Sequence, residues 1–219
     1  MLRFSAALLT AFVSLSALHA ENQFEISLAG GPAFPVRGLK QLVGTGYAAT
    51  GVMSVLLNDN ISVLAQGCYA RWQYSSEKIN ASAAAAGGAT GYSASGPFQA
   101  LLLTVGGRLT FDGALVRPFF GFSGGVGFLH RRFSGLAAPP GSSVSSGNFT
   151  SSWTEPAISI DAGLKFVLSS SMTLDLGGTY TAFSNADDRI EPREFMGTPI
   201  TGVNTATFIG VQAGLSVGF

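Results

Sequence analysis

The sequence has few of the residues on which disulfide-bonded, soluble or nucleic-acid-binding proteins depend. Its 219 residues include one cysteine, Cys68, which excludes an intrachain disulfide. Charged residues make up 11% of the chain, whereas a soluble domain carries about a quarter. The formal net charge is zero and no basic stripe runs along the sequence, so nucleic acid is excluded as a partner.

Long apolar runs are also missing after the N-terminal segment, although 47% of the residues are hydrophobic. A membrane-spanning helix needs about 18 or more consecutive apolar residues. The nearest approach, residues 42–57, is interrupted by several glycine, threonine and serine residues. A chain that crosses a lipid bilayer without helices must pair all its backbone groups in a closed barrel. The composition therefore favours a β-barrel in a membrane.

The N-terminus has the features of a secretory signal peptide. Arg3 precedes an apolar stretch at residues 6–18, and Ala20 offers a small residue at a cleavage site. The stretch is too short for a membrane span and is followed at once by Glu21 and Asn22. We therefore predict a signal peptide at residues 1–20 and one β-barrel domain at residues 21–219; the alternative is an uncleaved anchor helix.

The remaining chain contains segments in which apolar and small or polar residues alternate, the pattern of a strand with two unlike faces. The clearest runs from Trp153 to Leu168, with Ile158, Ile160 and Leu164 opposite Ser159, Asp161 and Lys165. The least regular runs from Ile61 to Tyr74, where Leu64 and Trp72 break the pattern and leave its facing undecided. In chain order, the eight predicted strands are residues 23–30, 46–57, 61–74, 98–111, 118–132, 153–168, 172–182 and 207–219.

The links between these segments alternate in length. Short links cover residues 58–60, 112–117 and 169–171, and the second of them contains the turn pair Asp112-Gly113. Long links, rich in small residues and predicted to be weakly structured, cover residues 31–45, 75–97, 133–152 and 183–206. This alternation is typical of a bacterial transmembrane barrel, with short periplasmic turns and long extracellular loops. We predict an all-β fold, an eight-stranded antiparallel up-and-down transmembrane β-barrel.

With these features the chain resembles the small eight-stranded outer membrane β-barrels, the opacity-type surface proteins and the barrel domain of outer membrane protein A. The resemblance covers residues 23–219 and includes the terminal Phe219, which ends the row of alternating apolar residues in the last predicted strand. It implies residence in the outer membrane of a Gram-negative bacterium, contact with outer membrane lipids and lipopolysaccharide, and recognition of Phe219 by the outer membrane assembly machinery. No residue motif identifies a subfamily or a loop ligand, and we expect a monomer.

Five charged residues fall on the small, polar faces of the predicted strands: Glu25, Arg108, Asp161, Lys165 and Asp175. On a barrel these faces point into the lumen, and eight strands leave a lumen that side chains can fill. Buried charges are costly unless they are paired. We predict a salt-bridged plug; the alternative is a narrow polar pathway for small solutes or ions.

Residues of the types used in catalysis are present, but their spacing matches no recognisable pattern. His130 could act with Asp187 and Asp188 as a protease, or with Ser134 as a lipid-modifying enzyme, yet catalysis needs positioned groups. We therefore predict a non-enzymatic protein of the envelope whose loops bind surface components, without cofactor or metal.

Four smaller features have two interpretations each. Arg131 and Arg132 could contact lipopolysaccharide phosphates or be solvated at the base of a loop. The charged run at residues 187–194 is either a solvated loop or a ligand-contact surface. Cys68 fits as a small side chain on the barrel wall rather than a metal ligand. Glycines at 124, 125 and 127 lie in a strand and would relieve crowding rather than hold a phosphate.

Overall fold

The computed structural model describes residues 24–85, 90–137, 147–184 and 206–219. The predicted signal peptide and the charged run at residues 187–194 lie outside these ranges. The elements are β1 (Phe24–Val36), the 3-10 helix η1 (Arg37–Gln41), β2 (Gly46–Leu56), β3 (Ile61–Gln73), α2 (Ser76–Ala85), β4 (Ser93–Ser95), β5 (Pro97–Thr110), β6 (Val116–Ala137), β7 (Gly147–Val167), β8 (Met172–Phe183) and β9 (Thr207–Gly218).

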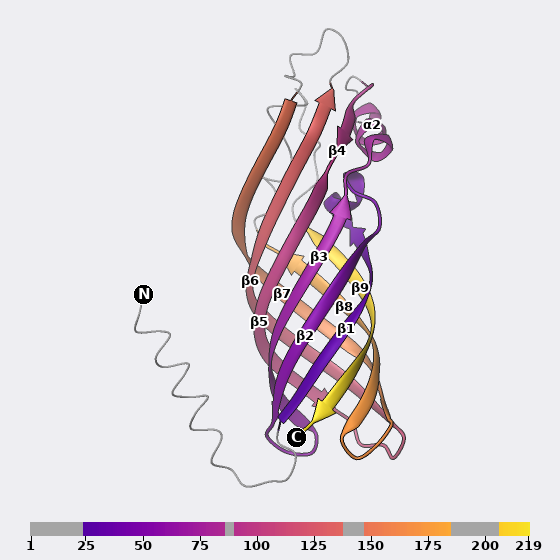
Figure 1. Ribbon diagram of the computed structural model, residues 1–219, viewed down its shortest axis with the longest axis vertical. Helices are drawn as coiled ribbons and strands as arrows, with labels where there is room; N and C mark the ends of the chain where they lie inside the picture. The colour runs from indigo at the N-terminus through magenta and orange to yellow at the C-terminus, as the bar shows by residue number, and fades with distance from the viewer. Residues whose placement is uncertain (1–23, 86–89, 138–146, 185–205) are drawn as a thin grey trace, which may run out of the picture.

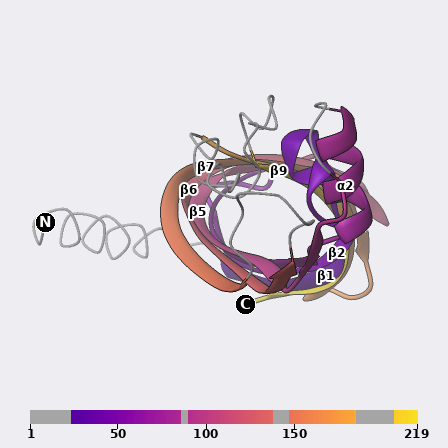
Figure 2. The same ribbon diagram turned by 90° about the horizontal axis from the view of Figure 1, so that it is seen from above.

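Eight long antiparallel strands close into a barrel, which confirms the predicted fold (Figures 1 and 2). Neighbours in the chain pair with each other, and β9 pairs with β1, from Glu25 opposite Gly218 to Val36 opposite Thr207. The short β4 adds to the edge of β6 beyond β5. Closure leaves the barrel wall without a free edge and pairs its backbone groups internally. No helix in the described part of the chain is long and apolar enough to cross a membrane.

The two ends of the barrel differ as the link lengths predict. We call the end with the short connections β2–β3, β5–β6 and β7–β8 the turn end; Phe24 and Phe219 also lie there and bond to each other through their backbones (Figure 1). The opposite end, which carries η1, α2 and β4, is the loop end. By the resemblance, the turn end faces the periplasm.

Outward-facing side chains form an apolar band around the barrel. On β5, Leu101, Leu103, Val105 and Leu109 are 39–50% exposed, while the alternating Thr104 and Arg108 are buried. The same alternation places Leu28, Met53, Phe122 and Ile160 outside on β1, β2, β6 and β7. So many exposed large apolar side chains on a closed wall have no favourable solvent except lipid.

The loop end is more ordered than the sequence predicts. The link at residues 75–97 contains α2 and β4, because its alanine-rich stretch favours a helix and Ile79 is buried. Lys78 Nζ donates a hydrogen bond to the Val43 carbonyl oxygen (2.8 Å), which fastens α2 to the segment after η1. Strands also run past their predicted ends: β1 continues to Val36, and β6 and β7 continue as a paired hairpin to Leu136 and Gly147.

Candidate functional site: the barrel lumen and its loop end

The irregular pattern of β3 is explained by the lumen. Even-numbered residues of β3 point inward, so Leu64 and Trp72 are 1% exposed, and Gln66 and Cys68 are buried with them. Odd-numbered Ile61 faces outward at 45% exposure. Apolar residues on both faces hide the alternation of this strand, because part of the lumen is itself apolar.

In the turn-end half of the lumen, Lys165 on β7 joins two carboxylates. Its Nζ contacts Glu25 Oε1 on β1 and lies 3.8 Å from Asp175 Oδ2 on β8. Ser27 Oγ donates to Glu25 Oε1 (3.2 Å) and is hydrogen-bonded to Ser216 Oγ (2.6 Å), which in turn donates to Asp175 Oδ2. The network therefore joins four consecutive strands of the barrel wall, β7, β8, β9 and β1.

A second ion pair lies deeper in the lumen. Arg108 on β5 donates from Nε and Nη2 to Asp161 Oδ2 on β7, at 3.2 and 3.0 Å. Both side chains are buried, and the Arg108 guanidinium lies 4.6 Å from the centroid of the Phe119 ring. Gly121 leaves room for this pair, since a Cβ there would lie 2.5 Å from Asp161 Oδ1. All five lumen charges of the sequence analysis thus lie in two contact groups.

Arg117 is a lumen charge that the sequence analysis missed. It has the inward parity of β6 and lines the opening at the turn end with Glu25 and Lys165. Counting it, three basic residues accompany three carboxylates in this half of the lumen. Beside the ion pairs the space is small, with a cavity of ≈ 50 Å³ beside Arg108 and Asp161 and another of ≈ 60 Å³ beside Lys165 and Glu25, whereas the mouth at the turn end opens into a recess of ≈ 330 Å³ lined by Glu25 and Arg117. A water molecule occupies about 30 Å³ of liquid, so each cavity has room for only a few.

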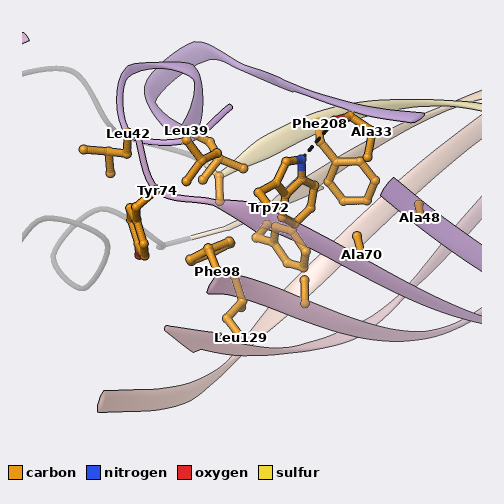
Figure 3. Packing of buried hydrophobic residues seen from close by; sticks show 14 of the residues in the cluster. Ala33, Leu39, Leu42, Ala48, Ala70, Trp72, Tyr74, Phe98, Leu129 and Phe208 are labelled. Carbon is orange, nitrogen blue, oxygen red and sulfur yellow. Dashed lines mark hydrogen bonds between the residues drawn. The ribbon is translucent and has the colours of Figure 1, made fainter. Parts of the chain in front are cut away.

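The loop-end half of the lumen is filled by an apolar plug, which we define as the buried cluster around Trp72, Phe98, Phe183 and Phe208 (Figure 3). The Trp72 ring lies 4.9 Å from Phe208 and 5.9 Å from Phe98, centroid to centroid. Trp72 Nε1 donates to the Ala33 carbonyl oxygen at 3.0 Å, so its one polar group is satisfied. Leu39, Leu42 and Val43, from η1 and the segment after it, are buried in the same cluster and close it at the loop end.

Two charged residues accompany the plug. Arg131 and Glu155 are each 6% exposed, and the Arg131 guanidinium lies 5.5 Å from the Trp153 ring centroid. Burial raises the pKa of the Tyr74 phenol above its ordinary value, and the nearby Arg131 charge offsets part of this rise. Tyr74 is therefore neutral at physiological pH. Strand parity could have identified both charged residues as inward-facing.

Arg131 and Arg132 were both expected on the outside, in contact with lipopolysaccharide phosphates or solvated at the base of a loop, and this is wrong for Arg131. Consecutive strand residues point to opposite faces, so Arg131 lies in the lumen and only Arg132 is exposed on the outside. His130 is also outward, and its Nδ1 is 2.7 Å from Ser152 Oγ rather than bonded to Ser134. Asp187 and Asp188 lie outside the described residues.

Gly127 does relieve crowding, because a Cβ there would lie 2.6 Å from Phe183 Cδ1, whereas one at Gly124 would not be crowded.

Comparison with known proteins agrees with this architecture. Neisserial surface protein A is 14% identical, with a TM-score of 0.53, over 92% of this chain and 100% of its own. Ail, the attachment invasion locus protein of Yersinia pestis, solved with the heparin analogue sucrose octasulfate, is 12% identical, with a TM-score of 0.53, over 91% of this chain and 100% of its own. The chain has the fold of the small eight-stranded outer membrane β-barrels. No protein-family model and no curated sequence matches it.

The location of this small outer membrane β-barrel follows from its surface. The closed wall carries an exposed apolar band, and only lipid covers such a band favourably. On β5 the band runs from Leu101 to Phe111, about 34 Å along the strand at 3.4 Å per residue and about 26 Å in height at a 40° tilt. That height matches the apolar band of an outer membrane barrel, about 25 Å. The protein is an outer membrane barrel.

Proposed function

We propose that this barrel is a non-enzymatic component of the outer membrane, with a closed lumen, that strengthens the envelope and presents its loop end as a binding surface. The observation that carries the proposal is the filling of the lumen in two layers. The ion pairs Arg108–Asp161 and Lys165–Glu25 cross the turn-end half, and the apolar plug fills the loop-end half. A passive pore would need a continuous polar path through both.

The non-enzymatic part of the proposal rests on the arrangement of the acid–base candidates. His130 has Ser152 as its hydrogen-bond partner, and no carboxylate lies on the outward face of β6 or β7 in the described residues to orient its imidazole. A serine nucleophile needs a base that is itself oriented. The pair is therefore better suited to holding a polar group at the membrane edge.

The binding part of the proposal rests on the β6–β7 hairpin. From His130 to Ala137, β6 continues for about 24 Å at 3.4 Å per residue past Phe128, the last outward apolar residue of β6 whose side chain the structure describes. His130 to Phe133 and Leu136 pair with β7 across a register shift, and Ser134 and Ala137 pair with β4. A paired hairpin above the membrane can present neighbouring loops to a partner such as a surface or matrix component, and loops of this kind carry specificity.

Conductance tests the closed lumen. We expect the purified protein in planar lipid bilayers to give no steady ion current, because neither small cavity continues through the plug. A matched variant with Trp72→Gly and Phe98→Gly should open the loop-end half and raise the current if the plug is the barrier. A large, steady current from the unmodified protein would replace this proposal with that of a narrow passive pore.

A further inference from the structure

The charges enclosed in the turn-end half of the lumen do not balance. The enclosed set consists of three carboxylates and two bases, with side chains at most 18% exposed: Glu25, Asp161, Asp175, Arg108 and Lys165. The third basic residue of this half, Arg117, is exposed at the opening, where its Nε donates to the Gly113 carbonyl oxygen. The enclosed set therefore carries one negative charge in excess, and a buried charge is costly unless it is paired or bound to a metal ion.

One carboxylate oxygen of this set is buried without a partner. Arg108 donates from Nε and Nη2 to the same atom, Asp161 Oδ2. Asp161 Oδ1 is buried and has no hydrogen-bond partner among the described residues, in a side chain that is 7% exposed. Buried polar atoms in proteins are nearly always satisfied, and an ionised oxygen requires a donor or a cation. This oxygen therefore marks a position that a ligand can satisfy.

The cavity of ≈ 50 Å³ is the space available for such a ligand. Asp161 and Asp175 both line it, and Arg108 is the one base among its lining residues. The other polar lining residues carry hydroxyl or amide groups: Ser27, Thr50, Gln66, Thr179 and Gln212. Gln212 Nε2 donates to Thr50 Oγ1 at 2.9 Å, so Gln212 Oε1 is available as an oxygen ligand. The cavity thus combines a net negative charge with several neutral oxygens.

We propose that this cavity binds one alkali-metal cation, Na⁺ or K⁺, beside the Asp161 carboxylate. The inference goes beyond the proposed function and departs from the sequence-based expectation that the chain holds no metal. One positive charge cancels the excess, whereas a divalent ion would reverse it. Carboxylate, hydroxyl and amide oxygens are ligands that hard cations prefer. The described residues contain no group of three or more His, Cys, Asp or Glu side chains that could hold a metal, so the neutral oxygens must supply most of the ligands.

The ion can reach this cavity from the turn end. The recess of ≈ 330 Å³ at that mouth and the cavity of ≈ 60 Å³ beside Lys165 have Glu25 and Arg117 in common. The cavities of ≈ 60 Å³ and ≈ 50 Å³ in turn share Arg108 as part of their walls. Towards the loop end, the apolar plug closes the lumen. An ion that enters from the turn end is therefore held in the lumen and not conducted through it.

The first test compares the stability of the folded full-length protein in chloride salts of different cations. Urea unfolding in lipid vesicles is measured in sodium chloride, in potassium chloride and, at the same ionic strength, in the chloride of methylglucamine, an organic cation too large for the cavity. Once the site is mostly occupied, a tenfold rise in the concentration of the bound ion should lower the unfolding equilibrium constant about tenfold, because the ion binds only the folded state. Equal stability in all these salts at every concentration would overturn the inference.

Asp175→Asn is the variant that tests the charge excess. It removes one carboxylate charge from the cavity and leaves the pairs Arg108–Asp161 and Lys165–Glu25 in place. We expect its stability to be the same in alkali and methylglucamine salts. The matched control is Asp112→Asn, which removes an exposed carboxylate between β5 and β6 at the same end and should keep the cation dependence of the parent. A cation dependence that persists in Asp175→Asn would contradict the proposal.

A second measurement locates the ion in the unmodified protein and does not depend on the folding of a variant. Thallium(I), which replaces K⁺, is soaked into crystals, and its anomalous scattering should give a peak in the lumen beside Asp161. No peak, or a peak only outside the lumen, would overturn the inference. A steady bilayer current together with a thallium peak beside Asp161 would contradict the closed lumen of the proposed function and support the cation site.

Discussion

At the scale of single residues, the lumen shows how buried charge is stabilised in a narrow barrel. Arg108 and Asp161 are both removed from solvent, and each is the other's charge partner. Removing one partner from a buried pair leaves an uncompensated charge, whereas removing both removes the cost as well. Stability therefore depends on the pair rather than on either residue.

A double-mutant cycle measures this coupling. Arg108→Ala alone should cost roughly 3–5 kcal/mol, and Arg108→Ala with Asp161→Ala should cost less than the sum of the single changes. The measurement is urea unfolding in lipid vesicles. The pair Arg108 and Glu25 is the control: Glu25 bonds to Lys165 instead, so those two changes should be nearly additive. Additivity for Arg108 with Asp161 would show that the two charges do not interact.

The plug gives a second prediction at this scale. Trp72→Ala removes a side chain that is 1% exposed and a hydrogen bond to Ala33, so unfolding free energy should fall by about 3–5 kcal/mol. Tyr47→Ala, on the outside at 51% exposure, is the matched control and should cost much less. Thermal unfolding in detergent provides the comparison. Similar losses for the two variants would mean that the aromatic cluster is not packed as described.

The charges of the turn-end half could be predicted from the sequence, and the plug could not. Glu25, Asp161 and Lys165 interrupt faces of small residues, so alternation alone assigns them to the lumen. Trp72, Leu64 and Phe98 are apolar residues on an inward face, and hydrophobicity does not distinguish a lipid neighbour from a packed interior. Arg131 was assigned to the outer edge together with Arg132, although consecutive residues of a strand point to opposite faces.

At the scale of elements, the strands consist of a membrane-spanning part and an extension. β7 is the clearest example: Ile158 to Leu168 alternate against the lipid, while Gly147 to Trp153 continue above the membrane with polar residues on the outward face. The extension is rich in serine and threonine and lacks the alternation, so the sequence alone suggests a loop. Its regularity comes from pairing with β6.

The outward facing of β7 can be tested by placing a charge at two different depths in the membrane. Leu164 lies near the middle of the six outward positions from Ile158 to Leu168 and is 40% exposed. Leu164→Arg should destabilise the barrel by roughly 2–4 kcal/mol, because the charge lies near the bilayer midplane. Leu168→Arg, at the end of the band, should cost about 0–1 kcal/mol. Equal unfolding midpoints in vesicles for both variants would contradict the outward facing of this strand.

At the scale of the whole molecule, three regions with different structural features follow one another along the barrel axis. The turn end holds the ion pairs and the backbone hydrogen bonds between Phe24 and Phe219, the middle carries the apolar band, and the loop end carries the plug and the hairpin. The fold and the apolar band follow from alternation and link length, which the sequence contains. The order at the loop end follows from α2 and η1 packing onto the plug, contacts that no local pattern reveals.

The meeting of β1 with β9 leads to the last prediction. Phe219 N–H donates to the Phe24 carbonyl oxygen at 2.8 Å, yet its side chain is 65% exposed on the outer surface. Its removal therefore costs little packing, and we expect the deletion variant, refolded into lipid vesicles, to unfold at a urea concentration close to that of the parent.

In cells the same deletion should behave differently. The resemblance to the outer membrane barrels implies that the assembly machinery reads this aromatic residue, so the variant should be secreted across the inner membrane but reach the outer membrane in reduced amounts. Phe219→Leu, which keeps an apolar side chain and both backbone bonds, should be affected less than Phe219→Ser. Fractionation of cells with quantitative immunoblotting provides the measurement. Normal outer membrane levels of the deletion variant would contradict the sorting role, whereas equal losses in vesicles and in cells would assign Phe219 to stability instead.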